Sequence, residues 1–458
     1  MLPTVRGYAG APSPVATGIA ALAAACRGAT FVIPLDNNAI LFAGTQTKLY
    51  KAGSTTWTDV TRTSSDYTGS SSSKWRFAQQ GNVTIAVNKE DESQYYLHGT
   101  STDFDDITDM PQTALVEAVG QFVLIGNYND GTDTVDGWGC SAIGDYTDWT
   151  ADPDTQCTYG RLIDTPGPVT GIKRLMDYAV YFKDRSIYLA RYVGSPFIWD
   201  FTLVSDSVGC ASNEAIVRVG TKIYFPGEYT FYSFDSATLQ DIGAPVREWF
   251  NANSNGLARD KIQGLHDAYR GVIYWFFPAG ADSSLTAWIA YSYMTDKWSK
   301  GDLDIETAVQ YTTAPKTYDE LDALYTTYNA YPEVSYDKLS GSGSTILPAV
   351  IDDTHTLAAL VGPSDSSMLT TNDFGEDGSI TLLSRLRPRY SISPDSAALT
   401  PRHRRNLGDT LTTEAIVDQY DGKFDCLQSD RWHRVKIVFT GDVEITGADV
   451  TVQPDGLE

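Results

Sequence analysis

The sequence predicts an all-β chain in which a six- to seven-bladed β-propeller is followed by a C-terminal β-sandwich-like domain. Three observations lead to this fold class. Short apolar runs recur between turn residues, and a marker aromatic returns about every 48 residues. Both the repeat and the acidic composition fade toward the C-terminus. We therefore expect the propeller over residues 1–350 and the second domain over residues 351–458.

Composition allows a large folded core and narrows the possible partners. The chain has 458 residues, of which 42% are hydrophobic, and its 58 acidic against 34 basic residues give a net charge of -24. The apolar content excludes a disordered acidic chain. The charge argues against reading a nucleic-acid sequence and against anchoring on anionic lipid, because both need cationic contacts. No apolar run reaches about eighteen residues, so we expect no membrane insertion.

The expected strands are rich in Val, Ile, Tyr, Phe and Trp, and each is bounded by Gly, Asn, Asp or Pro. Helical periodicity is scarce, and the best helix candidate is one or two turns over residues 244–250, which Pro245 opens. The clearest strand candidates are residues 39–43, 83–87, 121–125, 178–182, 222–225 and 272–277.

A unit made of a strand, a second strand, a polar turn and an aromatic residue repeats through this region. Its mean length of about 48 residues is typical of a four-stranded propeller blade. Such a sheet buries its faces only against neighbouring blades, so the repeats must close into a ring. Unrelated β-meanders are the alternative, but strand and marker order repeat together. The markers are Trp57, Phe104, Trp149, Trp199, Phe234 and Trp298.

Composition changes beyond the Gly/Ser stretch 340–344 and Gly362–Pro363. Residues 385–458 carry a net charge of -2, so the remaining residues carry -22. The acidity therefore belongs to the expected propeller and its connection. Three further strands are expected at residues 379–383, 434–439 and 448–452, and they form the separate C-terminal β-domain.

The five cysteines are widely spaced and contain no C-x-x-C pair, so free thiols are expected rather than a disulfide framework or zinc site. The apolar stretch 16–26 has a thin basic flank and two interrupting prolines, which favours a short buried helix or strand over a cleaved signal.

Signatures of catalysis are missing from the sequence. It contains no G-x-S-x-G, Walker A or H-E-x-x-H motif, and its five histidines are isolated from one another. Asn127 to Asp136 is the best calcium candidate, but it departs from the EF-hand spacing, and solvated acidic turns are the simpler interpretation. We expect no catalytic residue, no cofactor and no metal, although sequence spacing does not decide whether folding assembles a triad.

One basic cluster stands out in the C-terminal region. Arg385, Arg387 and Arg389 alternate with period two, which places them on one face of a strand. Nucleic-acid binding and a solvated surface are two interpretations. We favour a subunit or domain interface that meets the acidic propeller, because arginine pairs well with carboxylates. The candidate interface residues are Arg385, Arg387, Arg389, Arg402, Arg404, Arg405, Arg431 and Arg434.

Several stretches together resemble the propeller-type nozzle or hub proteins of short-tailed bacteriophages, also called packaged-DNA-stabilising or tail tubular proteins. The stretches are residues 42–51 with 57–60, 75–88, 140–149, 185–250, 386–390 and 431–437. They cover most of the chain, but the matching positions are spaced aromatic and glycine residues, and they include no catalytic motif. Cys140 replaces the tryptophan of the family's W-S-x-x-x-D turn, and residues 64–73 form a long polar insertion.

The resemblance implies a non-enzymatic virion protein. In that family several copies, typically six, ring the tail axis below portal and adaptor proteins and beside tail fibres or spikes. Double-stranded DNA passes through the lumen without specific binding, and packaged DNA is retained. The expected location is the virion tail, with assembly in the host cytoplasm. The alternative function is a glycan-binding or glycan-cleaving propeller, because rims of aromatic and carboxylate residues suit sugars.

Overall fold

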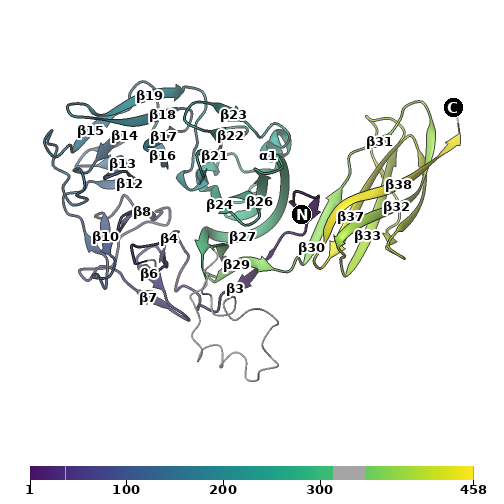
Figure 1. The fold of residues 1–458 in the computed structure, drawn as a ribbon, viewed down its shortest axis with the longest axis horizontal. Coiled ribbons are helices and arrows are strands. Elements are labelled where there is room, and N and C mark those ends of the chain that lie inside the picture. The colour runs from purple at the N-terminus through teal and green to yellow at the C-terminus, as the bar shows by residue number, and fades with distance from the viewer. Residues whose placement is uncertain (37, 313–345, 457–458) are drawn as a thin grey trace, which may run out of the picture.

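Small antiparallel sheets follow one another along the chain and stand around a common axis (Figure 1). The structure is a computed structural model, and it describes residues 1–36, 38–312 and 346–456. The Gly/Ser stretch 340–344 lies outside the described residues.

Five of the sheets have four strands each and form the first five blades. In each blade the strands pair in chain order, as in a meander. Blade 1 consists of β4 (Gly28–Val32), β5 (Ile40–Gly44), β6 (Leu49–Ala52) and β7 (Trp57–Asp59), and blade 2 of β8 (Arg76–Gln80), β9 (Val83–Val87), β10 (Gln94–Leu97) and β11 (Asp105–Asp106). Blade 3 consists of β12 (Gln112–Val119), β13 (Phe122–Asn129), β14 (Asp133–Cys140) and β15 (Thr158–Arg161), and blade 4 of β16 (Val169–Leu175), β17 (Tyr178–Lys183), β18 (Ile187–Gly194) and β19 (Ile198–Ser205). Blade 5 consists of β20 (Val217–Val219), β21 (Lys222–Pro226), β22 (Phe231–Phe234) and β23 (Leu239–Asp241).

The sixth and seventh blades share one long strand, β27 (Lys297–Tyr311). Its first part completes the sixth blade with β24 (Gln263–Asp267), β25 (Val272–Phe277) and β26 (Leu285–Ser292). From Ile305 onward it pairs with β28 (Leu347–Asp352), which is followed by β29 (Leu357–Gly362). The fourth strand of this last blade is β3 (Ser13–Ala16), from the other end of the chain. The ring therefore has seven blades, and the predicted six- to seven-bladed propeller is confirmed.

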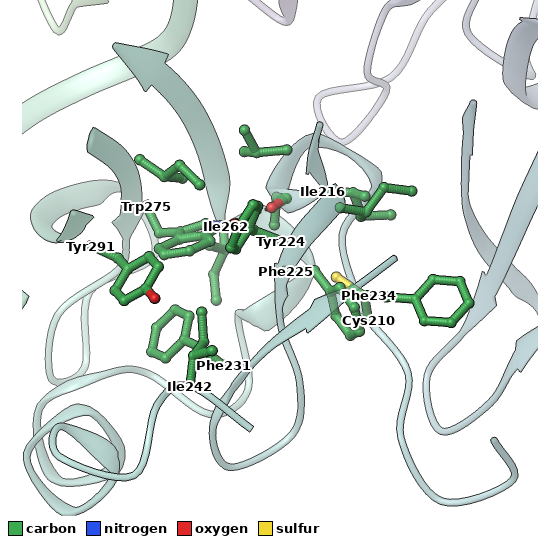
Figure 2. Packing of buried hydrophobic residues seen from close by; sticks show 14 of the residues in the cluster. Cys210, Ile216, Tyr224, Phe225, Phe231, Phe234, Ile242, Ile262, Trp275 and Tyr291 are labelled. Atoms are coloured by element: carbon green, nitrogen blue, oxygen red, sulfur yellow. Dashed lines mark hydrogen bonds between the residues drawn. The ribbon is translucent and has the colours of Figure 1, made fainter. Parts of the chain in front are cut away.

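Apolar clusters fill the space between successive blades all the way around the ring. They join blades 1 and 2, 2 and 3, 3 and 4, 4 to 6, 6 and 7, and 7 and 1. Figure 2 shows the cluster of blades 4 to 6, where the rings of Phe231 and Trp275 have centroids 4.8 Å apart. Each blade is thus covered on both faces by its neighbours, as a ring of repeats requires.

The six apolar runs expected as strands all become the second strand of a blade. They correspond to β5, β9, β13, β17, β21 and β25, in which most side chains are buried on both faces. A strand buried on both faces reads as a continuous apolar run. The marker aromatics are also explained, because all six lie in or against the clusters between blades: Trp57, Phe104, Trp149, Trp199, Phe234 and Trp298.

Two expectations about local structure have different outcomes. The short helix is present as α1 (Arg247–Asn253), close to the expected 244–250. The expectation of a helix or strand over residues 16–26 is wrong beyond Ala16, where β3 ends. That segment is irregular, and it buries Ile19, Leu22 and Cys26 in the cluster between blades 7 and 1. Two 3₁₀ turns, η1 (Asn213–Ala215) and η2 (Arg259–Lys261), precede the inner strands of blades 5 and 6.

The C-terminal domain is a sandwich of two antiparallel sheets beside the ring (Figure 1). Its core holds buried side chains from both sheets, among them Leu386, Leu399, Phe424 and Phe439. One sheet has the order β1 (Leu2–Pro3), β2 (Tyr8–Ala9), β38 (Glu444–Gly456), β32 (Ile380–Ile392) and β36 (Phe424–Asp430). The other has β30 (Ser366–Thr370), β37 (Trp432–Thr440), β33 (Ser396–Arg404) and β34 (Thr412–Thr413), with β31 (Phe374–Gly375) on β37 and β35 (Val417–Asp418) on β33.

Residues 1–16, which we call the strap, connect the two domains. Strands β1 and β2 extend a sheet of the sandwich, whereas β3 completes the seventh blade. Met1 lies in the sandwich core and Leu2 in the cluster of blades 6 and 7. Strand pairing thus divides the chain differently from the expected limits 1–350 and 351–458: residues 2–9 pair within the sandwich, and the ring continues to Gly362.

Candidate interaction surfaces

The three alternating arginines of β32 lie on one outer face of the sandwich. Arg385, Arg387 and Arg389 are exposed, while the residues between them are buried; we call them the arginine row. Arg385 donates from Nε to Oδ1 of Asp425 on β36 at 3.0 Å, and Arg389 donates from Nε to Oδ2 of Asp449 on β38 at 3.1 Å. Among the described residues, Arg387 forms no ion pair of its own. The row is therefore a striped surface of arginines and carboxylates.

Three of the remaining arginines, Arg402, Arg404 and Arg434, lie in the other sheet. Arg404 on β33 and Arg434 on β37 both bind Asp373, and Arg434 makes two contacts, at 3.0 and 2.7 Å. Arg402 stands directly opposite Arg434 in the strand register. Arg405 follows β33, and Arg431 connects β36 to β37.

These positions divide the predicted basic cluster between two surfaces. The two sheets pack with their buried faces together, so their outer faces point in opposite directions. The structure brings Arg385, Arg387 and Arg389 together, and it brings Arg402, Arg404 and Arg434 together, but it does not join the two groups. Intramolecular carboxylates compensate part of the positive charge on both faces.

A second charged site, which the sequence did not reveal, bridges the axis of the propeller. It comprises Lys74, Arg76, Glu214 and Asp260, and we call it the axial cluster. Arg76 donates from Nε to Glu214 Oε1 at 2.5 Å, and Lys74 Nζ lies 3.4 Å from Glu214 Oε2 and 2.5 Å from the carbonyl oxygen of Asp260. Lys74 and Arg76 lie at the start of blade 2, whereas the two acidic residues precede blades 5 and 6.

In a ring of seven blades, blades 5 and 6 are the ones farthest from blade 2, so these contacts cross the centre of the ring. Burial alone would raise the pKa of Glu214, but the charges of Arg76 and Lys74 hold it well below its ordinary value. The side chain of Glu214 is 21% exposed. A partly buried ion-pair network therefore spans the axis where the inner strands begin.

A related set of contacts links blades 6, 7 and 1 near the same end of the inner strands. Glu306 on β27 accepts the backbone N–H of Cys26 at 2.7 Å, and Gln263 on β24 donates to the Glu306 carbonyl at 3.0 Å. His355 Nδ1 lies 2.8 Å from Glu306 Oε1, at ion-pair distance but without hydrogen-bond geometry. These contacts join the last blade to its two neighbours.

Charged residues just before inner strands are the signal that could have identified the axial contacts. Lys74 and Glu214 each lie within three residues of the start of an inner strand, and Arg76 begins one. The partners are far apart in sequence, since Arg76 and Glu214 are separated by 138 positions. Their pairing follows only once the ring closes.

The five histidines do not gather into one site in the structure, although His403 and His433 stand opposite each other in the strand register. His98 and His433 are buried and bond the hydroxyls of Thr84 at 2.8 Å and Thr381 at 2.9 Å. His403 bridges two carboxylates, with Nδ1 2.7 Å from Asp430 and Nε2 3.0 Å from Glu414. These imidazoles are engaged in packing and ion pairing.

The calcium candidate lies around the β13–β14 hairpin, where cations of the protein occupy its ligands. Lys89 Nζ lies 2.6 Å from Asn127 Oδ1 and 2.7 Å from Asp133 Oδ1. Arg161 binds both oxygens of Asp136, at 2.9 and 3.0 Å. Across the described part of the chain, no group of three or more His, Cys, Asp or Glu side chains is placed to hold a metal ion.

Two further expectations concern cysteines and membranes. All five cysteines lie in the described ranges, and each is free and buried, as the sequence predicted for thiols at this spacing. No helix in those ranges is long and apolar enough to span a bilayer.

Comparisons with known proteins show only distant structural likeness. No protein-family model matches the chain, and no curated protein does. Similar solved structures include YCF48 bound to a D1 peptide (11% identity, TM-score 0.41, 79% of this chain and 98% of that one) and a chain of the mitotic checkpoint complex (8%, 0.42, 78% and 96%). A third is Hsv2 of Kluyvelomyces marxianus (9%, 0.35, 62% and 74%). The strand pairing establishes the fold as a β-propeller with a C-terminal β-sandwich.

Proposed function

We propose that this protein is a non-enzymatic virion protein of a short phage tail, a nozzle or hub. Several copies, six by the family resemblance, would form a ring on the tail axis and continue the portal and adaptor channel. The observation that carries the proposal is the two-domain subunit, in which the strap places Met1 and Leu2 in the cores of different domains. Such a subunit holds two different surfaces in a fixed relation, which a closed ring needs because its contacts are heterologous.

The axial cluster bears on where DNA would pass. Side chains of Lys74, Arg76 and Glu214 meet across the propeller axis, so the axis of one propeller does not offer an open bore. The lumen of a nozzle would therefore lie between copies. Because the propeller and its connection carry nearly all of the net charge of -24, a lumen lined by them would repel phosphate and let double-stranded DNA slide.

The C-terminal domain supplies surfaces for the neighbouring copy. Arg387 is exposed and forms no ion pair of its own among the described residues, although it stands opposite Asp449 in the strand register. It is therefore the candidate-interface arginine best placed to meet a carboxylate of an adjacent propeller. Retention of packaged DNA and docking to portal, adaptor and fibre or spike proteins follow from the same position on the tail axis.

The test combines assembly with DNA binding. Native mass spectrometry of the purified protein should show one closed oligomer, and linear double-stranded DNA should not be retained by it on a filter at about 50 mM salt, where cationic sites bind strongly. A protein that stays monomeric at every concentration, retains DNA tightly, or hydrolyses a glycan would contradict the proposal.

A further inference from the structure

We propose that neighbouring copies join by extending one sheet of the sandwich, so that β38 of one copy pairs with β36 of the next. This inference rests on the proposed ring and names the contact that builds it. It concerns the five-stranded sheet β1-β2-β38-β32-β36, in which β36 and most of β38 lack a strand partner on one side within the described ranges.

The first open edge belongs to β38. This strand pairs with β32 from Glu444 to Gly456, but on its other side β2 covers only Glu444 and Ile445. Among the described residues no strand pairs with that side of residues 446–456. Their outward backbone N–H and C=O groups form the template that an added strand uses.

Apolar side chains also lie open along this edge. Val450 and Val452 pair in register with Leu386 and Leu383, which are buried in the sandwich core. The two valines therefore point toward the core side of the sheet, yet they are 43% and 41% exposed. A strand laid beside β38 would cover them and continue the core.

The second open edge is β36, on the opposite side of the sheet. Its only strand partner in the described ranges is β32. Leu427 in its centre is 85% exposed on the outer face. A second, independent apolar residue thus marks this edge.

Charge is compatible with a second copy of the chain as the occupant. Asp449 on β38 and Asp425 on β36 would otherwise bring two carboxylates together, but Arg389 and Arg385 already bind them. The arginine row on β32 therefore compensates the negative charge of both edge strands, β36 and β38. Neither residues 446–456 nor β36 contains the lysine that commonly protects an edge strand, and Pro454, near the end of β38, is the one residue of 446–456 without a backbone N–H.

The chain already uses strand addition at these positions. The strap adds β2 to the first residues of β38 and β3 to the edge of the last blade. Pairing β38 with a second β38 would close a twofold dimer and leave Leu427 exposed. Pairing β38 with β36 joins two different edges, which a ring requires.

Two single variants and their mixture test this contact by native mass spectrometry. Val450→Lys blocks the β38 edge and Leu427→Lys blocks the β36 edge, and each alone should abolish rings. Mixed in equal amounts they keep one intact pair of edges between them, so the largest species should be a heterodimer. Leu257→Lys, at a propeller residue that is 98% exposed, is the matched control and should form rings.

Hydrogen exchange on the wild-type protein gives a readout that needs no variant. Amides in residues 446–456 and in 424–430 should both exchange at least tenfold more slowly in the ring than in the dilute monomer. Protection of 446–456 alone, or self-association of Leu427→Lys, would overturn the proposal in favour of a β38–β38 dimer. Normal rings formed by Val450→Lys would contradict the β38–β36 contact but not the proposed ring. A wild-type protein that never assembles would contradict both the contact and the ring.

Discussion

Single charged residues join blades that the chain itself keeps far apart. Glu214 is held by Arg76 from across the ring, and Glu306 holds the backbone of Cys26. Each contact replaces water around a partly buried charge with a specific partner, and losing one partner leaves the other uncompensated. The axis of the propeller is therefore the region where single substitutions should have large effects.

Glu214→Gln tests the axial cluster. The variant keeps the shape of the side chain but removes the charge that Arg76 and Lys74 bind, so we expect a loss of about 2 kcal/mol in unfolding free energy at pH 7. Because the folded pKa of Glu214 is lowered, its stabilisation is present above its ordinary pKa of 4.5 and lost as pH falls below it. Thermal unfolding at pH 7 and pH 4 measures both effects.

Glu117→Gln is the matched control, since Glu117 is also 21% exposed but lies 3.9 Å from its single partner, Lys173. It should cost well under 1 kcal/mol. Equal losses in the two variants, or a loss in Glu214→Gln that persists unchanged at pH 4, would contradict the assigned role.

His403 gives the opposite pH dependence. Burial lowers the pKa of His403, but hydrogen bonds to Asp430 and Glu414 outweigh this and raise the pKa above 6.5. The stabilisation is complete below pH 6.5 and is lost as pH rises through the raised pKa. His403→Gln should therefore lower the melting temperature of the sandwich at pH 6 more than at pH 9. The same decrease at both values would show that the imidazole charge contributes nothing.

At the scale of elements, the second strand of each of the first six blades could be predicted and the inner strand could not. Runs such as 83–87 are apolar because both faces are buried. Inner strands such as β8 mix Arg76 and Gln79 with apolar residues, since they also reach the axis and the loops. The seventh blade could not be recognised in the sequence, because β27, β28 and β29 are completed by β3 from the other end of the chain.

For the candidate site too, the sequence predicted the local pattern of the arginine row but not its partners. Period two in β32 correctly predicted one exposed face for Arg385, Arg387 and Arg389. Their partners Asp425 and Asp449 lie 40 and 60 positions away, so the internal compensation of charge depends on strand register. The separation from Arg402, Arg404 and Arg434 likewise follows from which sheet each strand joins.

The strap is the element expected to couple the domains. Leu2 is 2% exposed in the cluster of blades 6 and 7, and Leu2→Ala should cost about 3 kcal/mol. Its detachment should open the connection around residues 363–365, so that limited proteolysis releases the sandwich sooner. Val5→Ala, at a strap residue that is 76% exposed, should change stability by less than about 0.5 kcal/mol. Similar cleavage of both variants would argue against the strap as a coupling element.

At the scale of the whole molecule, the division of charge and the two-domain subunit belong together in the proposed ring. Arg387→Glu reverses the one member of the row without its own ion pair, so we expect at least a tenfold rise in the concentration needed for ring formation. Arg191→Glu, at an exposed strand residue of the propeller, is the control. Analytical ultracentrifugation over a concentration series measures both, and equal behaviour of the two variants would remove the arginine row from the interface.

The most direct measurement of the central claim is electron microscopy of the purified full-length protein. The account predicts class averages of closed rings of several copies, in which each copy shows a propeller beside a smaller sandwich and a central opening lies between copies. Particles that contain one propeller and one sandwich at every concentration would contradict it.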